Sequence, residues 1–352
     1  MLMVIFGAGA SFDSSPEFPT PPRDEANPRE SWRPPLANDL FSNPKQAFSH
    51  IVKQYPKLPH ILPYLRKRPV HKSVEEVLEQ LQEEAKDYPE RLRELASIKY
   101  YLRDLLFEVT NRWLAETDGV TNYAPLIGEF LRLNRSGEPI CLVTFNYDLL
   151  LDRALESFDY HPQEPEHQFN AHKTLKLFKP HGSVDWSRVV RLPPGDIMRP
   201  RGLIEDANGI QLTDEFVRSN DPLSADANPS GSTLFPVIAI PVQNKTDETF
   251  ACPRSHLTHL KELLPSVTRI LLIGWQAREA HFLQILRDHL PVRGRGVRHI
   301  LVVGKGAVDA KAILHHFAPE IGQSEYSTNH YCADGGFSKF VGNHEGEAFF
   351  GA

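Results

Sequence analysis

Three polar side chains in this sequence follow apolar runs of the length typical of buried strands. Asn146 and Asp148 lie in VTFNYD after the run at 139–145, and His181 lies in KPHGSVDW after another apolar stretch. Ligands of α/β sheets bind at the carboxyl ends of strands, which is where these residues would lie. Each also has an ordinary structural explanation, because asparagine often caps helices and one histidine among sixteen is more often structural than catalytic. Taken singly, none of the three establishes a catalytic site.

A glycine turn near the N-terminus has the residue types that hold phosphate groups. The run MLMVIF leads into GAGAS, where small residues would let backbone N–H groups approach a pyrophosphate and Ser11 would add a hydroxyl. The dinucleotide fingerprint of dehydrogenases needs a third small residue and an acidic residue about 20 positions further on, after a second strand. Phe12 occupies the third position here, and residues 13–35 are a proline-rich loop. The motif is therefore not a standard dehydrogenase fingerprint, and a plain tight turn is an equally good interpretation.

The composition narrows the classes of function. The chain has 352 residues, of which 41% are hydrophobic and 24% charged, as in ordinary globular proteins. Its formal net charge of −6 argues against nucleic-acid binding through a global positive field. The three cysteines, Cys141, Cys252 and Cys332, form no CxxC pair, which argues against a disulfide framework or a cysteine-based zinc site.

The apolar start differs from a signal peptide, because it lacks a basic region and meets its glycine turn after six residues. The longest apolar run elsewhere, ILLIGW, is too short to span a bilayer. We therefore expect a cytoplasmic protein without membrane contact.

The elements that would position the polar residues follow from the hydrophobic pattern. Strands are predicted at 139–145, 235–241, 269–274 and 297–304, and helices near 255–265, 279–290 and 307–317. Short apolar strands separated by helices of about a dozen residues indicate a parallel sheet covered on both faces. Between 191 and 232 the sequence is polar, and we expect a loop there.

The first half of the chain is predicted to be largely helical over 36–135. Capping boxes are predicted at 73–76 and 87–90, and an amphipathic stretch runs from the second box to about Glu116. The predicted fold class is thus α/β: a Rossmann-like parallel sheet with helices on both faces, plus a helical insertion after its first strand.

GAGAS, FNYD and PHGS, in this order in an α/β chain, resemble the sirtuin family of NAD-consuming enzymes. IPVQNKTDETF at 240–250 and LLIGWQAREAHF at 271–282 resemble strand-end loops of bacterial sirtuin-like domains in antiphage defence systems. The resemblance implies a single sirtuin-like domain over 1–352. Its Rossmann-like core would comprise 1–13 and 136–345, with a variable helical insertion at 36–135.

The resemblance also implies roles for individual residues. Asn146 would orient the attacking water or the nicotinamide ribose, Asp148 would recognise the nicotinamide carboxamide, and His181 would be the general base. Further contacts to NAD+ would come from the glycine turn, the end of the 139–145 run and, near the adenosine half, the 271–282 segment: Gly7, Ala8, Gly9, Ala10, Ser11, Phe145, Gly274 and Glu279.

Cleavage of the nicotinamide–ribose bond needs few groups. It expels a neutral pyridine, so it does not require the carboxylic acid with which ordinary glycosidases protonate their leaving group. Aligning sugar and water can supply up to about 7–11 kcal/mol, and a histidine base adds roughly 10²–10⁴-fold. Asn146 and His181 suit these two tasks, and we expect no metal.

Deacetylating sirtuins carry a four-cysteine zinc module after the histidine segment, whereas 183–240 contains no cysteine. Water is then the expected acceptor, so we predict NAD+ hydrolysis to nicotinamide and ADP-ribose, as the NAD-depleting effector of an antiphage (abortive infection) system. Protein deacylation or ADP-ribosyl transfer is the first alternative, and a non-catalytic module that binds NAD+ or ADP-ribose is the second. Such an effector must be silent at rest, so we expect activation by homo-oligomerisation or by a partner such as a HerA-like ATPase or an Argonaute. We expect no direct nucleic-acid binding.

Overall fold

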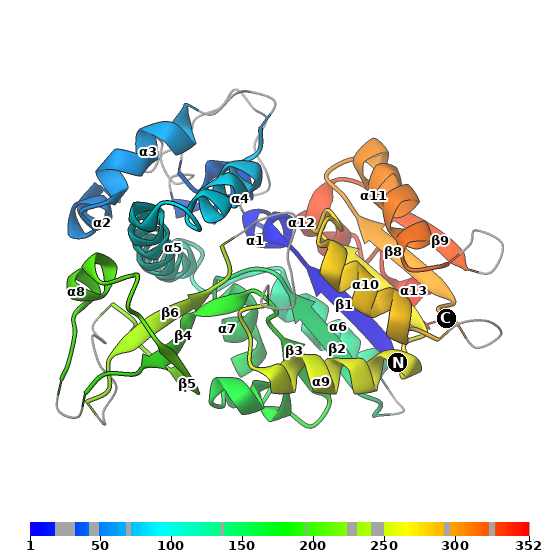
Figure 1. The fold of residues 1–352 in the computed structure, drawn as a ribbon. Helices are drawn as coiled ribbons and strands as arrows, with labels where there is room; N and C mark the ends of the chain where they lie inside the picture. The colour runs from blue at the N-terminus through cyan, green and yellow to red at the C-terminus, as the bar shows by residue number, and fades with distance from the viewer. Residues whose placement is uncertain are drawn as a thin grey trace.

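The computed structural model of the chain contains a six-stranded sheet and a three-stranded sheet (Figure 1). The structure describes residues 1–17, 32–41, 49–67, 72–134, 137–193, 196–223, 231–240, 250–291, 296–323 and 328–351. Most of the predicted loop at 13–35 and most of the 240–250 segment lie outside these residues.

The six-stranded sheet is parallel throughout and has the strand order β3-β2-β1-β7-β8-β9. Its strands are β1 (Leu2–Phe6), β2 (Ile140–Thr144), β3 (Leu175–Phe178), β7 (Arg269–Ile273), β8 (His299–Val303) and β9 (Asn329–Ala333). The order reverses between β1 and β7, as in Rossmann folds, and this reversal opens a crevice at the carboxyl ends of the strands. The predicted Rossmann-like α/β class is confirmed.

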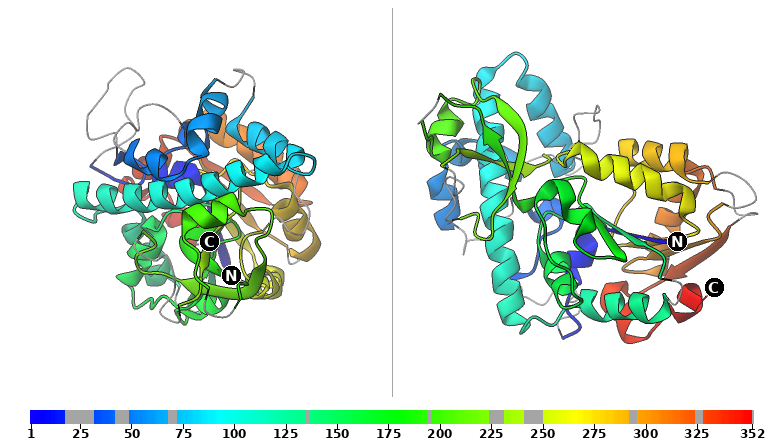
Figure 2. Two further views of the ribbon diagram at one scale, coloured as in Figure 1. Left: turned by 60° about the vertical axis from the view of Figure 1, so that its left-hand side comes forward. Right: turned by 90° about the horizontal axis from the view of Figure 1, so that it is seen from below.

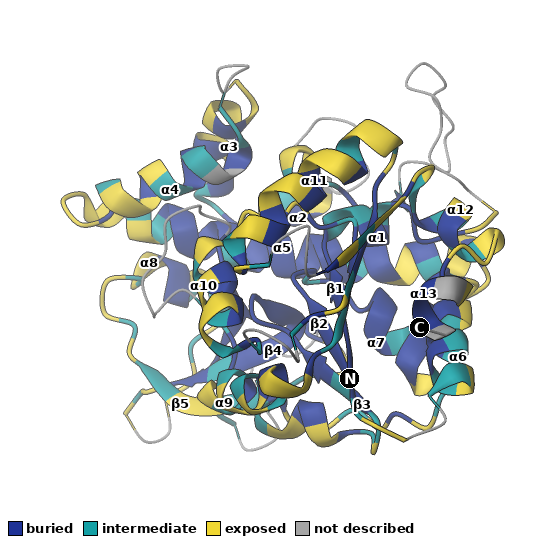
Figure 3. Cartoon of the chain, turned by 90° about the vertical axis from the view of Figure 1, so that its right-hand side faces the viewer, coloured by how far each residue is buried: buried dark blue, intermediate teal, exposed yellow. Residues whose placement is uncertain are grey.

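Both faces of the sheet are buried at its centre, because alternate residues of β1 enter different apolar clusters. Met3 and Ile5 face α9 (Arg254–Leu263), α10 (Ala280–His289) and α11 (Ala307–Glu320). Leu2, Val4 and Phe6 face the opposite layer. That layer consists of α6 (Tyr123–Leu133), α7 (Leu150–Glu156), α12 (Gly336–Gly342) and α13 (Glu347–Gly351). Figure 3 shows the buried strands between helices whose outer sides are exposed.

The three-stranded sheet is antiparallel and packs on a long helix. Its order is β5-β4-β6, formed by β4 (Gly182–Val190), β5 (Leu212–Arg218) and β6 (Leu234–Ile238). The long helix α5 (Pro89–Glu116) shares one apolar cluster with this sheet and with α2 (Ser49–Gln54), α3 (Leu58–Arg66), α4 (Val74–Glu84) and α8 (Pro200–Glu205). Figure 2 shows this second unit beside the main sheet. The short helices are α1 (Ala8–Phe12), η2 (Ala37–Asp39), η4 (Pro165–Asn170) and η6 (Leu264–Ser266).

The predicted elements of the main sheet are confirmed, but those of the small sheet need correction. The strand predicted at 235–241 exists as β6, yet it belongs to the antiparallel sheet rather than the parallel one. The loop predicted at 191–232 contains α8 and β5. β5 is only partly buried, so its sequence lacks the apolar run that marks a buried strand.

The first half of the chain is largely helical, as predicted, but its two predicted capping boxes have different outcomes. Ser73 forms the predicted capping box, since its hydroxyl accepts from the N–H of Glu76 and the Glu76 carboxylate accepts from the N–H of Ser73. The second box is wrong: Tyr88 is the N-cap of α5, with Pro89 in its first turn. The range 36–135 divides between two packing clusters, because α6 packs on the main sheet. Within the described residues, no helix is both long enough and apolar enough to cross a bilayer.

Candidate functional site

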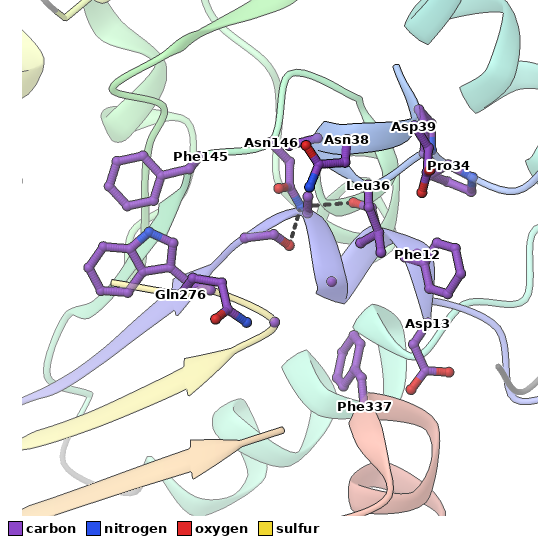
Figure 4. Close-up of a pocket in the computed structure, with 18 of the residues that line it drawn as sticks. Phe12, Asp13, Pro34, Leu36, Asn38, Asp39, Phe145, Asn146, Gln276 and Phe337 are labelled. Atoms are coloured by element: carbon purple, nitrogen blue, oxygen red, sulfur yellow. Dashed lines mark hydrogen bonds between the residues drawn. The ribbon is translucent and has the colours of Figure 1, made fainter. Parts of the chain in front are cut away.

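A cavity of about 510 Å³ lies at the carboxyl ends of the main sheet (Figure 4). Its floor is built from the segments that follow β1, β2, β7 and β8, at the reversal of strand order. Residues 34–40, Ser73 and Leu106 line it from the helical first half of the chain. The cavity therefore lies between the Rossmann-like core and the second unit.

All but one of the residues predicted to form the site line this cavity. They are Gly7, Ala8, Gly9, Ser11, Phe145, Asn146, Asp148, His181, Gly274 and Glu279. The exception is Ala10, which is fully buried in the apolar cluster between the sheet and α6.

The glycines of GAGAS allow the turn after β1 to pack against the turn after β7. The N–H groups of Gly7 and Gly9 donate to the carbonyls of Ile273 and Gly274, at 3.1 and 3.0 Å. A Cβ at Gly7 would lie 2.7 Å from the Gly274 oxygen, and Gly274 itself has a φ of +61°. Only glycine fits such close backbone contact without strain. These two N–H groups serve the protein's own backbone, so the expectation that they approach a pyrophosphate does not fit their hydrogen bonds.

Asn146 is clamped to the glycine turn by its side chain. Its Nδ2 donates to the Gly7 carbonyl at 3.0 Å and to the Ser11 hydroxyl at 2.8 Å, as the dashed lines in Figure 4 show. Neither residue is the N-cap of the following helix α7, which is Leu149, but the Asp148 Oδ1 accepts from the N–H of Leu150 at 3.0 Å. The capping explanation for Asn146 is thus excluded, and its side chain is tied to the cavity wall.

Asp148 is a buried carboxyl group at the base of the cavity. Burial raises its pKa above the ordinary value, while hydrogen bonds from Ser11 and from the Leu150 N–H, together with the charge of Lys179, act in the opposite direction. The site therefore contains a buried carboxyl group that can titrate.

His181 lies where the chain passes from the main sheet to the small sheet. The edge of its ring meets Phe145 with the centroids 4.8 Å apart, and 7% of the residue is exposed, on the cavity side. Its carbonyl accepts from the N–H of Ala239 at 2.9 Å. Gly182 has a φ of +82°, and a Cβ there would lie 2.0 Å from the Val237 oxygen. The glycine after His181 is required by this close approach to β6.

Residues 140–220 match the SIR2-like domain family. The match covers less than a quarter of the chain, but it runs from β2 through Asn146, Asp148 and His181 into β5. No curated protein matches the chain. The SIR2-like segment supports the resemblance to sirtuins, and with it a function that involves NAD+.

Lys179 of the SIR2-like segment is a structural residue that the sequence analysis missed. Its fully buried Nζ donates to Asp152 at 2.8 Å, to the Ser183 hydroxyl at 2.8 Å and to the Asp148 carbonyl at 3.1 Å. It joins the segment after β3, which carries His181, to the segment after β2. The only signal in the sequence is a lysine that ends the apolar run LKLFK.

An aromatic wall completes one side of the cavity. Trp275 stacks on Phe145 with centroids 5.1 Å apart and planes at 8°, and its Nε1 donates to Glu279 at 2.6 Å. The Glu279 carboxylate is thereby held at the cavity. The exposed side chains of Arg278 and Lys305 line the same cavity and bring positive charge to it.

The SIR2-like segment continues after His181 into β4 and β5 of the small sheet.

Cys141, Cys252 and Cys332 are free thiols, and burial raises the pKa of Cys252 to about 12. Among the described residues, no group of three or more His, Cys, Asp or Glu side chains is arranged to hold a metal ion.

Proposed function

We propose that this chain is an NAD+ glycohydrolase that releases nicotinamide and ADP-ribose. The observation that carries the proposal is the convergence of Asn146, Asp148 and His181 in one cavity at the reversal of strand order, within the SIR2-like segment. The cavity volume of about 510 Å³ lies within the range of about 300–1,000 Å³ typical of small-molecule sites. Arg278 and Lys305 suit the pyrophosphate, and the Phe145–Trp275 wall suits a planar ring.

In the proposed reaction the bond between nicotinamide nitrogen and ribose C1′ breaks, and its electron pair neutralises the pyridinium charge. A water oxygen bonds to C1′ and loses one proton. His181 accepts that proton and passes it to solvent, while Asp148 binds the carboxamide of the leaving nicotinamide. The side chain of Asn146 presents its Oδ1 as a hydrogen-bond acceptor for water or a ribose hydroxyl, because both of its N–H bonds are used by the protein.

Two features favour water over a protein side chain as the acceptor. Residues 34–40 line the cavity from the helical side, and the 3₁₀ helix η2 within them is tied down because Asn38 accepts from the Val74 N–H at 3.1 Å. The small sheet follows His181 directly, where deacetylating sirtuins carry their zinc module. Deacylation and ADP-ribosyl transfer need an open groove for a peptide, and these features restrict one. Binding of NAD+ without turnover would make no use of a histidine that lines the same cavity as Asn146.

We further propose the biological setting that the sirtuin resemblance implies. The chain would act in bacteria as the NAD-depleting effector of an antiphage system, in the cytoplasm. Its activity would be switched on by homo-oligomerisation or by a partner such as a HerA-like ATPase or an Argonaute.

Product analysis tests the reaction class. Purified protein is incubated with NAD+, with and without an acetyl-lysine peptide and with and without candidate partner proteins, and the products are separated by chromatography. Equal amounts of nicotinamide and free ADP-ribose, unchanged by the peptide, are expected. Acetylated ADP-ribose or a modified peptide would support transfer instead. Binding of NAD+ without any nicotinamide would support the non-catalytic alternative.

A further inference from the structure

A tyrosine behind the cavity wall is hydrogen-bonded to Ser11 and lies within hydrogen-bonding reach of the proposed catalytic asparagine. Tyr123 begins α6, is fully buried and does not line the cavity. Its hydroxyl lies 3.1 Å from the Ser11 hydroxyl, which also accepts from Asn146 at 2.8 Å. The tyrosine ring is fixed between Phe6 and Phe337, with centroids at 5.4 and 5.3 Å. The Tyr123 hydroxyl is therefore a rigid part of the wall.

The valences of the Ser11 hydroxyl fix the direction of each hydrogen bond. A serine hydroxyl has one proton and two lone pairs. Its proton goes to Asp148, with which Ser11 forms a hydrogen bond, and one lone pair accepts from Asn146. The second lone pair is then left for Tyr123, and we assign its hydroxyl as the donor to Ser11. Burial raises the pKa of Tyr123 well above its usual value, so the hydroxyl keeps the proton that it donates.

This arrangement also fixes the orientation of the Asn146 amide. The Gly7 carbonyl can only accept, so the amide atom facing it, at 3.0 Å, is the nitrogen. Turning the amide over would set two oxygens against each other at Gly7. The Ser11 hydroxyl already forms three hydrogen bonds, which use its proton and both lone pairs. It therefore cannot also bind a phosphate or a ribose. Ser11 therefore supports Asn146 and Asp148 rather than binding the ligand.

We propose that Tyr123 is a positioning residue for the NAD+ cleavage site. By donating to Ser11, it holds the Asn146 amide with its oxygen available to the reacting water or ribose. The inference rests on the proposed hydrolase function for its effect on turnover. That the Tyr123 and Ser11 hydroxyls do not contact the ligand can be tested by binding alone, without turnover.

The test compares Tyr123→Phe with Tyr160→Phe. Tyr160 is equally buried and donates to the Gln168 carbonyl at 3.2 Å, but it does not line the cavity or contact the Ser11 cluster. Both variants lose one buried hydrogen bond, so similar falls in Tm are expected. Only Tyr123→Phe should lower kcat, by about fivefold, with the KM for NAD+ within about twofold of wild type. The dissociation constant of ADP-ribose, measured by calorimetry, should stay within about twofold in Tyr123→Phe and Ser11→Ala.

Two results would overturn the inference. One is a Tyr123→Phe enzyme with wild-type kcat, or with the same loss of kcat as Tyr160→Phe. The other is a more than fivefold weaker affinity of Ser11→Ala or Tyr123→Phe for ADP-ribose, which would make these hydroxyls ligand contacts. A wild-type protein that releases no nicotinamide contradicts the proposed function instead, and the ADP-ribose affinities then decide the inference by themselves.

Discussion

Replacing Lys179 by methionine should strongly destabilise the folded chain, although the two side chains have similar volumes. Methionine fills a similar volume but leaves the Asp152 carboxylate, 2% exposed by its side chain, without its cation. The Ser183 hydroxyl and the Asp148 carbonyl lose their donor as well. Removing one partner of a buried ion pair costs about 3–5 kcal/mol, because the other charge stays buried.

The loss can be measured as a shift in thermal unfolding. With an unfolding entropy of about 2.1 cal/mol/K per residue, about 4 kcal/mol corresponds to a fall in Tm of about 5 °C for 352 residues. The matched control is Lys176→Met on the neighbouring strand β3, where the lysine donates to the His172 carbonyl and is partly exposed. A smaller fall is expected there.

A second substitution tests whether the buried charge is the cause. Asp152→Asn keeps an oxygen for the Gln168 amide, which donates to Asp152 at 2.9 Å, but removes the negative charge. Adding it to Lys179→Met should therefore recover part of the lost stability. The reasoning is refuted if Lys179→Met unfolds within about 1 °C of wild type, or if the double variant is less stable than Lys179→Met.

Two further predictions concern stability. Gly182→Ala should cost more than about 3 kcal/mol, because it combines a positive φ with a Cβ 2.0 Å from the Val237 oxygen. Gly119→Ala, whose φ is +73° and whose Cβ meets no described atom within 4 Å, should cost only about 1–2 kcal/mol in urea unfolding; equal losses would contradict this. Burial lowers the pKa of His256 to about 4 from 6.5, so the unfolded state binds more protons between these values. The free energy of unfolding should therefore be unaffected above pH 6.5 and fall by about 3 kcal/mol as the pH drops to 4. His256→Gln should reduce this dependence on pH. If wild type and variant lose stability in parallel, the histidine is not the cause.

The central strands of the main sheet and the meeting of the motifs are predictable from the sequence for one reason. Parallel strands place their carboxyl ends at one edge, so FNYD and PHGS, each following an apolar run, must approach GAGAS. Asn146 and His181 accordingly line one cavity with Gly7. The role of the glycines is harder to predict, because sequence does not distinguish a turn that opens toward a ligand from one that packs on Gly274.

The remaining features depend on packing between segments far apart in sequence. Lys179 pairs with a residue 27 positions away, and Tyr123 meets Ser11 across 112 positions. Most of the small sheet, β4 and β5, was not predicted for a related reason. β4 mixes polar and apolar residues, such as Asp185 and Trp186, yet both are buried by neighbouring elements. Such burial has no local signature, because it is decided by the partner surface.

The most direct test of the account is nicotinamide release from NAD+ by wild type, Asn146→Ala and His181→Ala. His289→Ala on α10 and Asn343→Ala near the C-terminus serve as controls, because neither residue lines the cavity. The account predicts that wild type, with its activating partner where one is needed, and both controls release nicotinamide. Asn146→Ala and His181→Ala should fold cooperatively, with a modest fall in Tm for Asn146→Ala because it loses two buried hydrogen bonds, and show no turnover. Substantial activity in either variant, or its absence from wild type under every condition, would contradict the central claim.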